Sequence, residues 1–361
     1  MRQVRMLGRQ RVEVIGADRP EPTDEAPVIV AVRASGICGS EMGVYRSDKP
    51  SEGNAGHEVA GVVVEAPDRS LIDERVGVTA VVGCGRCEYC QRDQDTYCDS
   101  WRGWSNAHAE FVARPVRAIR VFPDDVQCDW PAAVLLSGDG LGVPFRVAWK
   151  LGDTAGKTTL VIGLGPIGLG NVLIQVHKHA RVLGLDPIAV RRELATQLGA
   201  ECFDPTAEGL DDWLADRCGR GPEIIIECVG SNAALTQALR WARPGGTVVT
   251  VGENPAAEFN LADTVLRKDL TVRGSWYYQP ADFAPMLDLY RAGLAVERLI
   301  THRFPLERAA EAFELFAAGQ TGKVILEMSS RSSPNACGPL PDGRGSDRAG
   351  PPGQHRGPAS D

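Results

Sequence analysis

A glycine-rich turn near the middle of the chain is the feature that most narrows the possible folds. Gly163, Gly165 and Gly168 have the G-x-G-x-x-G spacing and follow an apolar β-type run at 160–162. A segment with helical periodicity comes next, and then a second apolar run that ends at Asp186. This order of strand, glycine turn, helix and acidic residue predicts a dinucleotide-binding βαβ unit.

Each position in this turn has a physical reason. Gly163 permits the sharp turn, Gly165 lets the backbone approach a pyrophosphate, and Gly168 lets the helix pack against the strand. We expect the helix to begin near Pro166, with Ile167 in its first turn, so that its free N–H groups and positive dipole end face the pyrophosphate. The alternative is an ordinary tight turn in which the glycines serve packing alone.

The acid at the end of the second run bears on the choice of cofactor. Asp186 would accept hydrogen bonds from both ribose hydroxyls and would repel the 2′-phosphate of NADP. Arg191 lies nearby in the sequence and would reduce that repulsion. The pattern therefore predicts NAD.

Composition excludes several classes of protein. The 361 residues allow two domains, and 43% hydrophobic and 24% charged residues are close to globular averages. A net charge of −8 without a basic cluster argues against a nucleic-acid surface. We find neither an apolar run of membrane-spanning length nor a secretory signal, so we expect a cytoplasmic protein without membrane contact.

The strongest local signal of metal binding is a polar loop with four cysteines. Cys84, Cys87, Cys90 and Cys98 form C-x2-C-x2-C-x7-C. Four thiolates can complete a tetrahedral shell around zinc, as a structural zinc site requires. An iron–sulfur cluster also uses four thiolates, and paired disulfides are the simplest alternative. In a reducing compartment, structural zinc is the preferred interpretation.

A second, weaker metal signal precedes this loop. Cys38, in SGICGSE, and His57, in AGHEVAG, stand in glycine-rich surroundings. A thiolate and an imidazole together suit zinc. Each residue alone is more often structural than a ligand.

Four motifs in one order give the chain a family resemblance. GICGSE, GHEVAG, the four-cysteine loop and GLGPIGLG resemble those of the zinc-dependent medium-chain alcohol and polyol dehydrogenases, over about residues 28–328. The resemblance implies an α/β fold, with a β-rich GroES-like catalytic domain at 1–145 to which 277–328 returns. It also implies a doubly wound parallel-sheet Rossmann domain at 146–276.

The resemblance also assigns roles to residues of the first metal signal. Cys38 and His57 match the first two ligands of a catalytic zinc. Ser40 matches the hydroxyl that bonds the substrate oxygen and passes its proton outward. Glu41 matches an acid that supports the ligand histidine, and Glu58 matches an acid beside the metal that is a ligand in some members.

The chain departs from the family pattern at the third ligand. Many members have a cysteine there, but Cys128 falls too early, and Asp139, in SGDGLGVPF, stands at the matching place. We therefore predict a catalytic zinc on Cys38, His57 and Asp139, with Glu58 as a further ligand; a helix N-cap is the alternative role for Asp139. Gly43 replaces a histidine that ends the proton relay in many members.

Further cofactor contacts follow from the resemblance alone. It implies that Val229, Val251 and Ser275 lie near the adenosine and nicotinamide. Lys323 matches a basic residue that meets the pyrophosphate, although a solvated lysine is the ordinary alternative. The aromatic residues 276–278 would lie near the nicotinamide and the substrate, or would serve packing.

Together these observations predict an NAD-dependent zinc alcohol or polyol dehydrogenase with two zinc ions per chain. The substrate would be a small-molecule alcohol or polyol, and the family implies a homodimer or homotetramer. The alternatives are a zinc-free medium-chain enone or quinone reductase and a non-enzymatic zinc-lobe binding module. Residues 329–361 are rich in Gly, Pro and Ser, so we expect disorder there, with Cys337 and His355 free.

Overall fold

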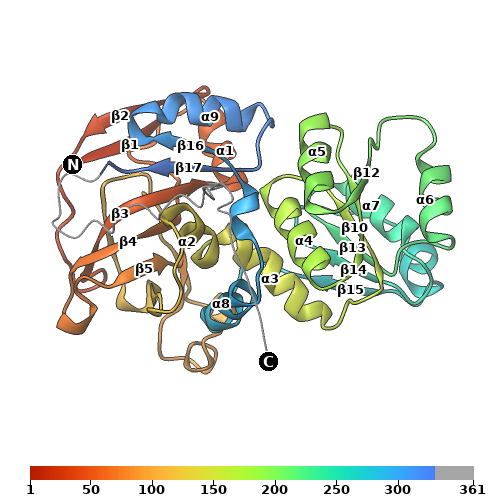
Figure 1. Ribbon diagram of the computed structural model, residues 1–361, viewed down its shortest axis with the longest axis horizontal. Coiled ribbons are helices and arrows are strands. Elements are labelled where there is room, and N and C mark those ends of the chain that lie inside the picture. Colours follow the sequence, from red (N-terminus) through yellow and green to blue (C-terminus); the bar gives the residue numbers. More distant parts are fainter. Residues whose placement is uncertain (330–361) are drawn as a thin grey trace, which may run out of the picture. The chain divides into compact units, whose positions relative to one another are not determined.

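Two large β-sheets, one mixed and one parallel, organise the chain. The computed structural model describes residues 1–329, so the prediction of a disordered tail with free Cys337 and His355 lies outside the described residues. Figure 1 shows the mixed sheet, which combines strands β3 to β9 with the last strands β16 and β17, and the parallel sheet, which is built from strands β10 to β15.

The mixed sheet is built from two distant parts of the sequence. Among the described residues its strand order is β16-β17-β3-β4-β5-β9, with β8 also paired to β3. Its strands are β3 (Val28–Ile37), β4 (Glu58–Glu65), β5 (Arg75–Val78), β8 (Phe111–Arg114), β9 (Ile119–Val121), β16 (Ile300–Pro305) and β17 (Lys323–Glu327). β17 is antiparallel to β3, so the end of the described chain returns to its beginning.

Smaller elements surround this sheet. β1 (Arg2–Gly8) and β2 (Arg11–Gly16) form an antiparallel pair, as do β6 (Val81–Val82) and β7 (Arg102–Gly103). The short helix α1 (Met42–Arg46) follows β3 after one 3-10 turn. Helix α9 (Ala309–Ala317) is followed by Gly319 in the left-handed region, with φ +74°.

The parallel sheet has the strand order β12-β11-β10-β13-β14-β15 within residues 1–329. This is the order of the doubly wound dinucleotide-binding fold. Its strands are β10 (Thr158–Ile162), β11 (Arg181–Leu185), β12 (Glu201–Phe203), β13 (Ile224–Glu227), β14 (Thr247–Thr250) and β15 (Thr271–Gly274). The predicted fold class is therefore confirmed.

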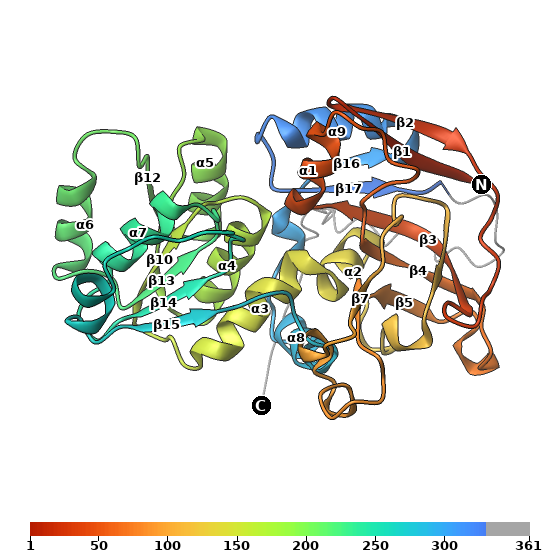
Figure 2. The same cartoon turned by 180° about the vertical axis from the view of Figure 1, so that it is seen from behind.

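Helices cover both faces of the parallel sheet because its buried strands alternate their side chains. Val161 of β10 packs in one core with Val172 of α4 (Pro166–His177), whereas Leu160 packs in another core with Leu239 of α7 (Asn232–Trp241). Figure 2 shows the sheet from the side opposite to Figure 1. Helices α5 (Ala189–Leu198) and α6 (Leu210–Cys218) also belong to this part.

Two consecutive helices lead from the mixed sheet to the parallel one. The Asp129 carboxylate caps α2 (Trp130–Ser137) by accepting the Ala132 N–H at 2.9 Å. Gly138 is extended and separates α2 from α3 (Asp139–Leu151). Asp139 is thus the first residue of α3, and its side chain makes no capping hydrogen bond, so the alternative role as an N-cap is wrong.

Close packing joins α3 to α4, the helix that follows the glycine turn. A Cβ at Gly170 would lie 2.6 Å from the carbonyl oxygen of Gly140 and 2.6 Å from Cγ of Pro144. Only a residue without a side chain allows the two backbones to approach this closely. The helix that starts at Asp139 therefore packs directly on the helix that starts at the glycine turn.

The predicted domain boundaries stay a prediction. Residues Met1–Ser329 form one compact unit, in which α3 packs both on α2, next to the mixed sheet, and on α4, next to the parallel sheet. No helix in the described part of the chain is both long and apolar enough to cross a bilayer.

The α3–α4 contact leads to a stability prediction. We expect Gly170→Ala to lower the free energy of unfolding by about 1–3 kcal/mol, because overpacking a dense contact forces the backbones apart. Chemical denaturation measures the change. Gly43→Ala is the matched control, since this exposed helical glycine has open space around its Cβ position. Equal stability of the two variants would contradict the proposed role of the contact.

Candidate active site

The four predicted ligands of the catalytic metal come together from three parts of the chain. Cys38 follows β3, His57 immediately precedes β4, Glu58 begins β4, and Asp139 begins α3. One potential ligand atom from each lies within 4.8 Å of the others. The Asp139 Oδ2 atom is 3.1 Å from His57 Nε2 and 3.9 Å from Cys38 Sγ.

The electrostatics of this cluster are those of a buried ion pair. Burial alone would lower the pKa of His57, but the charge of Asp139 and hydrogen bonds to Asp139 and Cys38 raise it well above its ordinary value. Burial alone would raise the pKa of Asp139, but His57 outweighs it and the pKa is lowered. Asp139 therefore stays ionised although it is only 8% exposed.

The donor set fits a zinc ion. Sulfur, imidazole nitrogen and carboxylate oxygen are the ligands that zinc prefers. Asp139 Oδ1 is buried and has no hydrogen-bond partner among the described residues. A buried carboxylate oxygen without a partner is costly unless a cation binds it. The cluster therefore has the ligand types of a zinc site and a buried oxygen that a bound cation would stabilise.

Lys323 has a different neighbour from the one that the resemblance implied. Its side chain is 2% exposed, and its ammonium is paired with the buried Glu58 carboxylate. Burial alone would lower the pKa of Lys323, but Glu58 raises it. The alternative of a solvated lysine is wrong, because the Lys323 ammonium is buried and paired with Glu58. Contact of Lys323 with the pyrophosphate stays a prediction.

The support of the ligand histidine also differs from the expectation. In the part of the chain that the structure describes, Glu41 makes no hydrogen bond to His57; its carboxylate lies 2.8 Å from His108 Nε2 and accepts the N–H of Cys38 at 2.8 Å. His57 Nδ1 instead lies 2.9 Å from the carbonyl oxygen of Ala55. The sequence reasoning missed His108, because only the tertiary structure brings it to Glu41.

The first step of the predicted proton relay lies at the surface. Ser40 is exposed in the 3-10 turn after Cys38. Gly43 has open space beside it, and Tyr45 is buried against Phe313 with ring centroids 5.5 Å apart. Tyr45 therefore belongs to the core, and the structure offers no side chain at Gly43 to extend a relay.

A run of aromatic rings starts beside Asp139. The Tyr277 hydroxyl accepts the N–H of Ala80 at 2.9 Å, and the Tyr277 backbone has φ +53°, which is rare for a residue with a side chain. Tyr278 stacks on it at 4.5 Å and donates its hydroxyl to Ser137 O at 2.5 Å. Trp276, 41% exposed, continues the run.

The four cysteines of the polar loop form the second potential metal cluster. Their sulfur atoms lie within 4.8 Å of one another, and no disulfide joins them in the described chain, so the disulfide alternative is wrong. Backbone N–H groups of Arg86 and Cys87 lower the pKa of Cys84 to about 6. Asp95 supports the loop by accepting the Gly83 N–H at 2.9 Å and by pairing with Arg117.

The glycine turn has the geometry that its spacing predicts. Gly163 has φ +87°, and a Cβ at Gly168 would lie 1.9 Å from the Gly163 carbonyl oxygen. Asp186 is 3% exposed; its Oδ2 accepts the Leu164 N–H at 2.8 Å, and its Oδ1 accepts the Ile188 N–H at 2.8 Å. The carboxylate is thereby fixed at the edge of the turn.

A pocket of about 500 Å³ opens beside this turn. The predicted cofactor residues that line it are Gly163, Gly165, Asp186, Arg191 and Val229. Arg191 Nη1 lies 3.6 Å from Asp186 Oδ2, close enough to reduce the acid's charge. Pro166, Ile167 and Gly168 start α4 next to the pocket.

Two other predicted cofactor residues, Val251 and Ser275, do not line this pocket. Val251 is partly buried against the core, and Ser275 is 3% exposed. Ser275 Oγ has no hydrogen-bond partner in the described part of the chain. Their contact with a cofactor stays a prediction.

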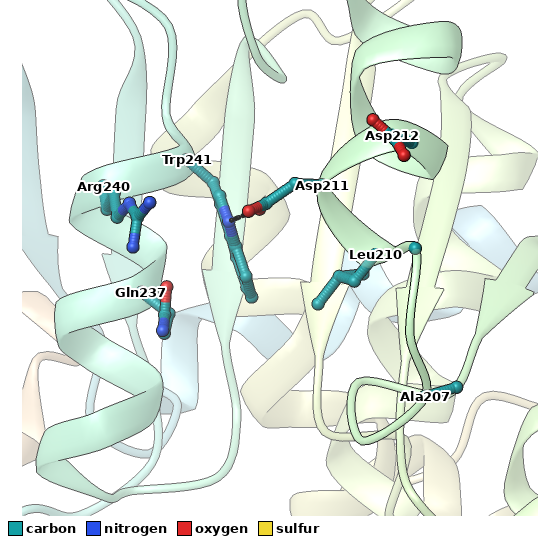
Figure 3. Close-up of a pocket in the computed structure, with 8 residues that line it drawn as sticks. Ala207, Leu210, Asp211, Asp212, Gln237, Arg240 and Trp241 are labelled. Atoms are coloured by element: carbon teal, nitrogen blue, oxygen red, sulfur yellow. Dashed lines mark hydrogen bonds between the residues drawn. The ribbon is translucent and has the colours of Figure 1, made fainter.

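A second pocket of about 380 Å³ lies between the start of α6 and the end of α7 (Figure 3). It shares Leu210, Gln237 and Trp241 with the first pocket, and Trp241 Nε1 donates to Asp211 Oδ1 at 3.3 Å. None of the predicted site residues lines it.

Comparison with known proteins gives matches over nearly the whole described chain. Residues 24–124 match the alcohol dehydrogenase GroES-like domain, and residues 166–292 match the zinc-binding dehydrogenase family. L-threonine 3-dehydrogenase of Symbiobacterium thermophilum is 31% identical over 327 residues, which cover 83% of this chain and 90% of that protein. A probable zinc-binding alcohol dehydrogenase of Mycobacterium tuberculosis is 32% identical over 87% of this chain and 85% of its own length.

Solved structures agree with these matches. The alcohol dehydrogenase TADH from Thermus sp. ATN1 superimposes with a TM-score of 0.83 at 29% identity, covering 91% of this chain and 100% of that one. An alcohol dehydrogenase from Escherichia coli CFT073, solved with NADH, has a TM-score of 0.79 at 27% identity, with coverage of 91% and 99%.

The four-cysteine cluster gives a prediction about metal content. We expect Cys90→Ser to reduce the bound zinc by one ion per chain and to expose the loop to proteases, because loss of one thiolate opens the tetrahedral shell. Elemental analysis and limited proteolysis measure both effects. Cys218→Ser is the control, since its sulfur donates to Leu214 O at 2.9 Å, which a hydroxyl can also do. Unchanged zinc in Cys90→Ser would rule out the site.

Proposed function

The chain belongs to the zinc-dependent medium-chain alcohol dehydrogenase family, and from this premise we propose that it oxidises an alcohol or polyol to a carbonyl with NAD as hydride acceptor. The observation that carries the proposal is the convergence of Cys38, His57 and Asp139, with Asp139 Oδ1 left without a partner among the described residues. Relatives named for dehydrogenation of L-threonine and of alcohols support this class of substrate. The four-cysteine loop would hold a second, structural zinc.

The residues of the cluster would divide the chemistry among them. Cys38, His57 and Asp139 would hold the zinc, with Glu58 as a further ligand. When bound, zinc supplies a Lewis acid that lowers the pKa of the alcohol hydroxyl, and NAD supplies the hydride acceptor. Ser40, exposed after Cys38, would take the hydroxyl proton and pass it to solvent.

Glu58 and Lys323 would regulate the charge of the ligand set. Three anionic ligands around a divalent ion would leave a net negative site if Glu58 also bound. The Lys323 ammonium beside Glu58 offsets that charge and holds the carboxylate back. A site that alternates between Glu58 and a substrate as the last ligand is compatible with this arrangement.

The pocket beside the glycine turn would bind the cofactor. Gly163, Gly165 and the first turn of α4 would face the pyrophosphate, and Asp186 would accept hydrogen bonds from the ribose hydroxyls. NAD use is supported by the ionisable acid at this place and by the related alcohol dehydrogenase solved with NADH. Arg191, 3.6 Å from the acid, would weaken discrimination against NADP.

Two further parts of the proposal concern the setting of the enzyme. A reducing compartment such as the cytoplasm would keep the thiolate ligands reduced. Assembly into a homodimer or homotetramer is supported by the exposed strand β15 at the edge of the parallel sheet, where unpaired backbone groups favour pairing with another chain.

The ligand set gives the first test of this function. We expect Asp139→Ala to lower kcat/KM by more than about 100-fold, because loss of a metal ligand exceeds the usual 10–100-fold effect of its outer partners. The variant should lose one zinc per chain and still bind NAD. Zinc counting, NAD-reduction assays across alcohols, polyols and sugars, and NAD titration measure the three effects.

Asp139→Cys is the matched control, since a thiolate restores a ligand and should retain the zinc. Full activity and full zinc content in Asp139→Ala would overturn the assignment. If the wild-type protein failed to reduce NAD with every alcohol, polyol and sugar in the assays, the proposed reaction would be overturned.

The cofactor preference gives a second test. We expect Asp186→Asn to lower the preference for NAD over NADP by about tenfold or more, since a hydrogen bond to a charged group contributes about 1.5–3 kcal/mol. The ratio of kcat/KM values for the two cofactors measures it. Glu201→Gln, which removes an exposed acid on β12, is the control. A wild-type enzyme that used both cofactors equally would contradict the role of Asp186.

A further inference from the structure

His108 lies between the two loops that carry the first metal ligands. Its ring is fully buried, and it precedes β8 by a short coil. Nδ1 lies 2.8 Å from Ser35 Oγ, and Nε2 lies 2.8 Å from Glu41 Oε2. The edge of the ring also packs on Phe313 of α9, with centroids 5.6 Å apart. Both polar atoms and the apolar edge of the ring are therefore engaged.

The contacts on one side of His108 lead to Cys38. Glu41 Oε2 faces the histidine, and the other oxygen of the same carboxylate, Oε1, accepts the backbone N–H of Cys38 at 2.8 Å. The path from Ser35 through His108 and Glu41 to Cys38 is continuous and buried. It fixes the turn at which β3 ends and presents the Cys38 sulfur.

The contacts on the other side of His108 lead to His57. The backbone N–H of His108 donates to Asn54 Oδ1 at 3.1 Å, and this oxygen also accepts the backbone N–H of Gly56 at 3.2 Å. The ring itself lies against Gly56, where an added Cβ would be 2.5 Å from His108 Cδ2. The N–H of Ala107 donates to Gly56 O at 2.9 Å. The segment before His57 is therefore held by the same residue.

Both oxygens of the buried Glu41 carboxylate have a partner: Oε2 faces His108 Nε2, and Oε1 accepts the Cys38 N–H. A buried carboxylate must keep its partners. Without the imidazole, Glu41 would lose the partner of one oxygen and would be free to turn away from Cys38.

We propose that His108 is a positioning residue that holds the Cys38 turn and the His57 segment in the arrangement required for the metal, an inference that rests on the catalytic zinc site proposed above. His108 binds no metal itself. It acts by reducing the reorganisation that the two ligand segments need when zinc arrives. Loss of such a supporting partner typically lowers metal affinity by about 10–100-fold.

The test compares zinc affinity at the two sites of one chain. We expect His108→Phe to weaken zinc binding at the Cys38 site by about 10–100-fold, because the aromatic edge remains while both nitrogen contacts are lost. The four-cysteine site should keep its affinity and serves as an internal reference. Chelator competition with elemental analysis measures both, and cobalt substitution reports the ligand geometry at the Cys38 site through its visible absorption.

Two further variants separate positioning from general stability. His302→Phe is the matched control, since this partly buried histidine stacks on Phe304 in β16 and its Nδ1 lies 2.9 Å from Thr301 Oγ1. His108→Gln should recover part of the affinity, because its amide can still donate to Glu41. If His108→Phe does not fold, Glu41→Ala breaks the same path from its other end and should also weaken the Cys38 site.

The outcomes are distinct. Selective loss at the Cys38 site with partial recovery in His108→Gln supports the proposal. Wild-type zinc affinity at the Cys38 site of His108→Phe overturns the positioning role, and so does wild-type affinity in Glu41→Ala if His108→Phe does not fold. In either case the zinc dehydrogenase function still stands. A wild-type chain that takes up zinc only at the four cysteines overturns the proposed function and this inference together.

Discussion

The buried carboxylate of Asp139 is the interaction on which the rest of the site depends. It is 8% exposed, it stays ionised beside His57, and one of its oxygens has no partner among the described residues. Burial of an ionised carboxylate is costly unless positive charge or hydrogen-bond donors surround it. The first turn of α3 supplies the positive end of a helix dipole, and His57 supplies a second source of charge. A divalent cation would supply the partner that the second Asp139 oxygen lacks among the described residues.

The same helix relates this carboxylate to the nucleotide-binding turn. α3 begins at Asp139 and packs on α4, which begins just after Gly165, and the close approach at Gly170 brings backbone against backbone. Contact between backbones leaves little freedom for sliding, because no flexible side chain can adjust between them. A rigid joint of this kind suits a reaction in which the distance between hydride donor and acceptor must be set by the protein.

The support of the metal ligands is spread over residues that are far apart in the sequence. The acid after Cys38 reaches His108 instead of the ligand histidine, and His57 turns its Nδ1 to a backbone carbonyl. Lys323, from the last strand of the described chain, neutralises Glu58. Cys38 and Glu58 are therefore supported by groups from distant parts of the chain, and the Lys323 contact ties the geometry of the site to the pairing of β17 with β3.

Local patterns in the sequence determined the parts of this protein that local physics controls. The glycine spacing at 163–168, with its strand and helix, predicted a turn that has those dihedral angles, because φ near +87° at Gly163 excludes most other residues. Apolar runs predicted the strands on either side of this helix, β10 and β11, since strands buried on both faces have few polar positions. The cysteine spacing at 84–98 predicted a cluster because one short loop carries all four sulfur atoms.

Only the tertiary structure decided which distant groups meet. Helix period and strand alternation contain no information about the pairing of Lys323 with Glu58 or of His108 with Glu41, which join residues 265 and 67 positions apart in the sequence. The sequence alone made Glu41 a partner of His57 and left Lys323 free for a cofactor or for solvent. A buried charge takes the partner that packing brings within reach, and packing depends on the whole fold.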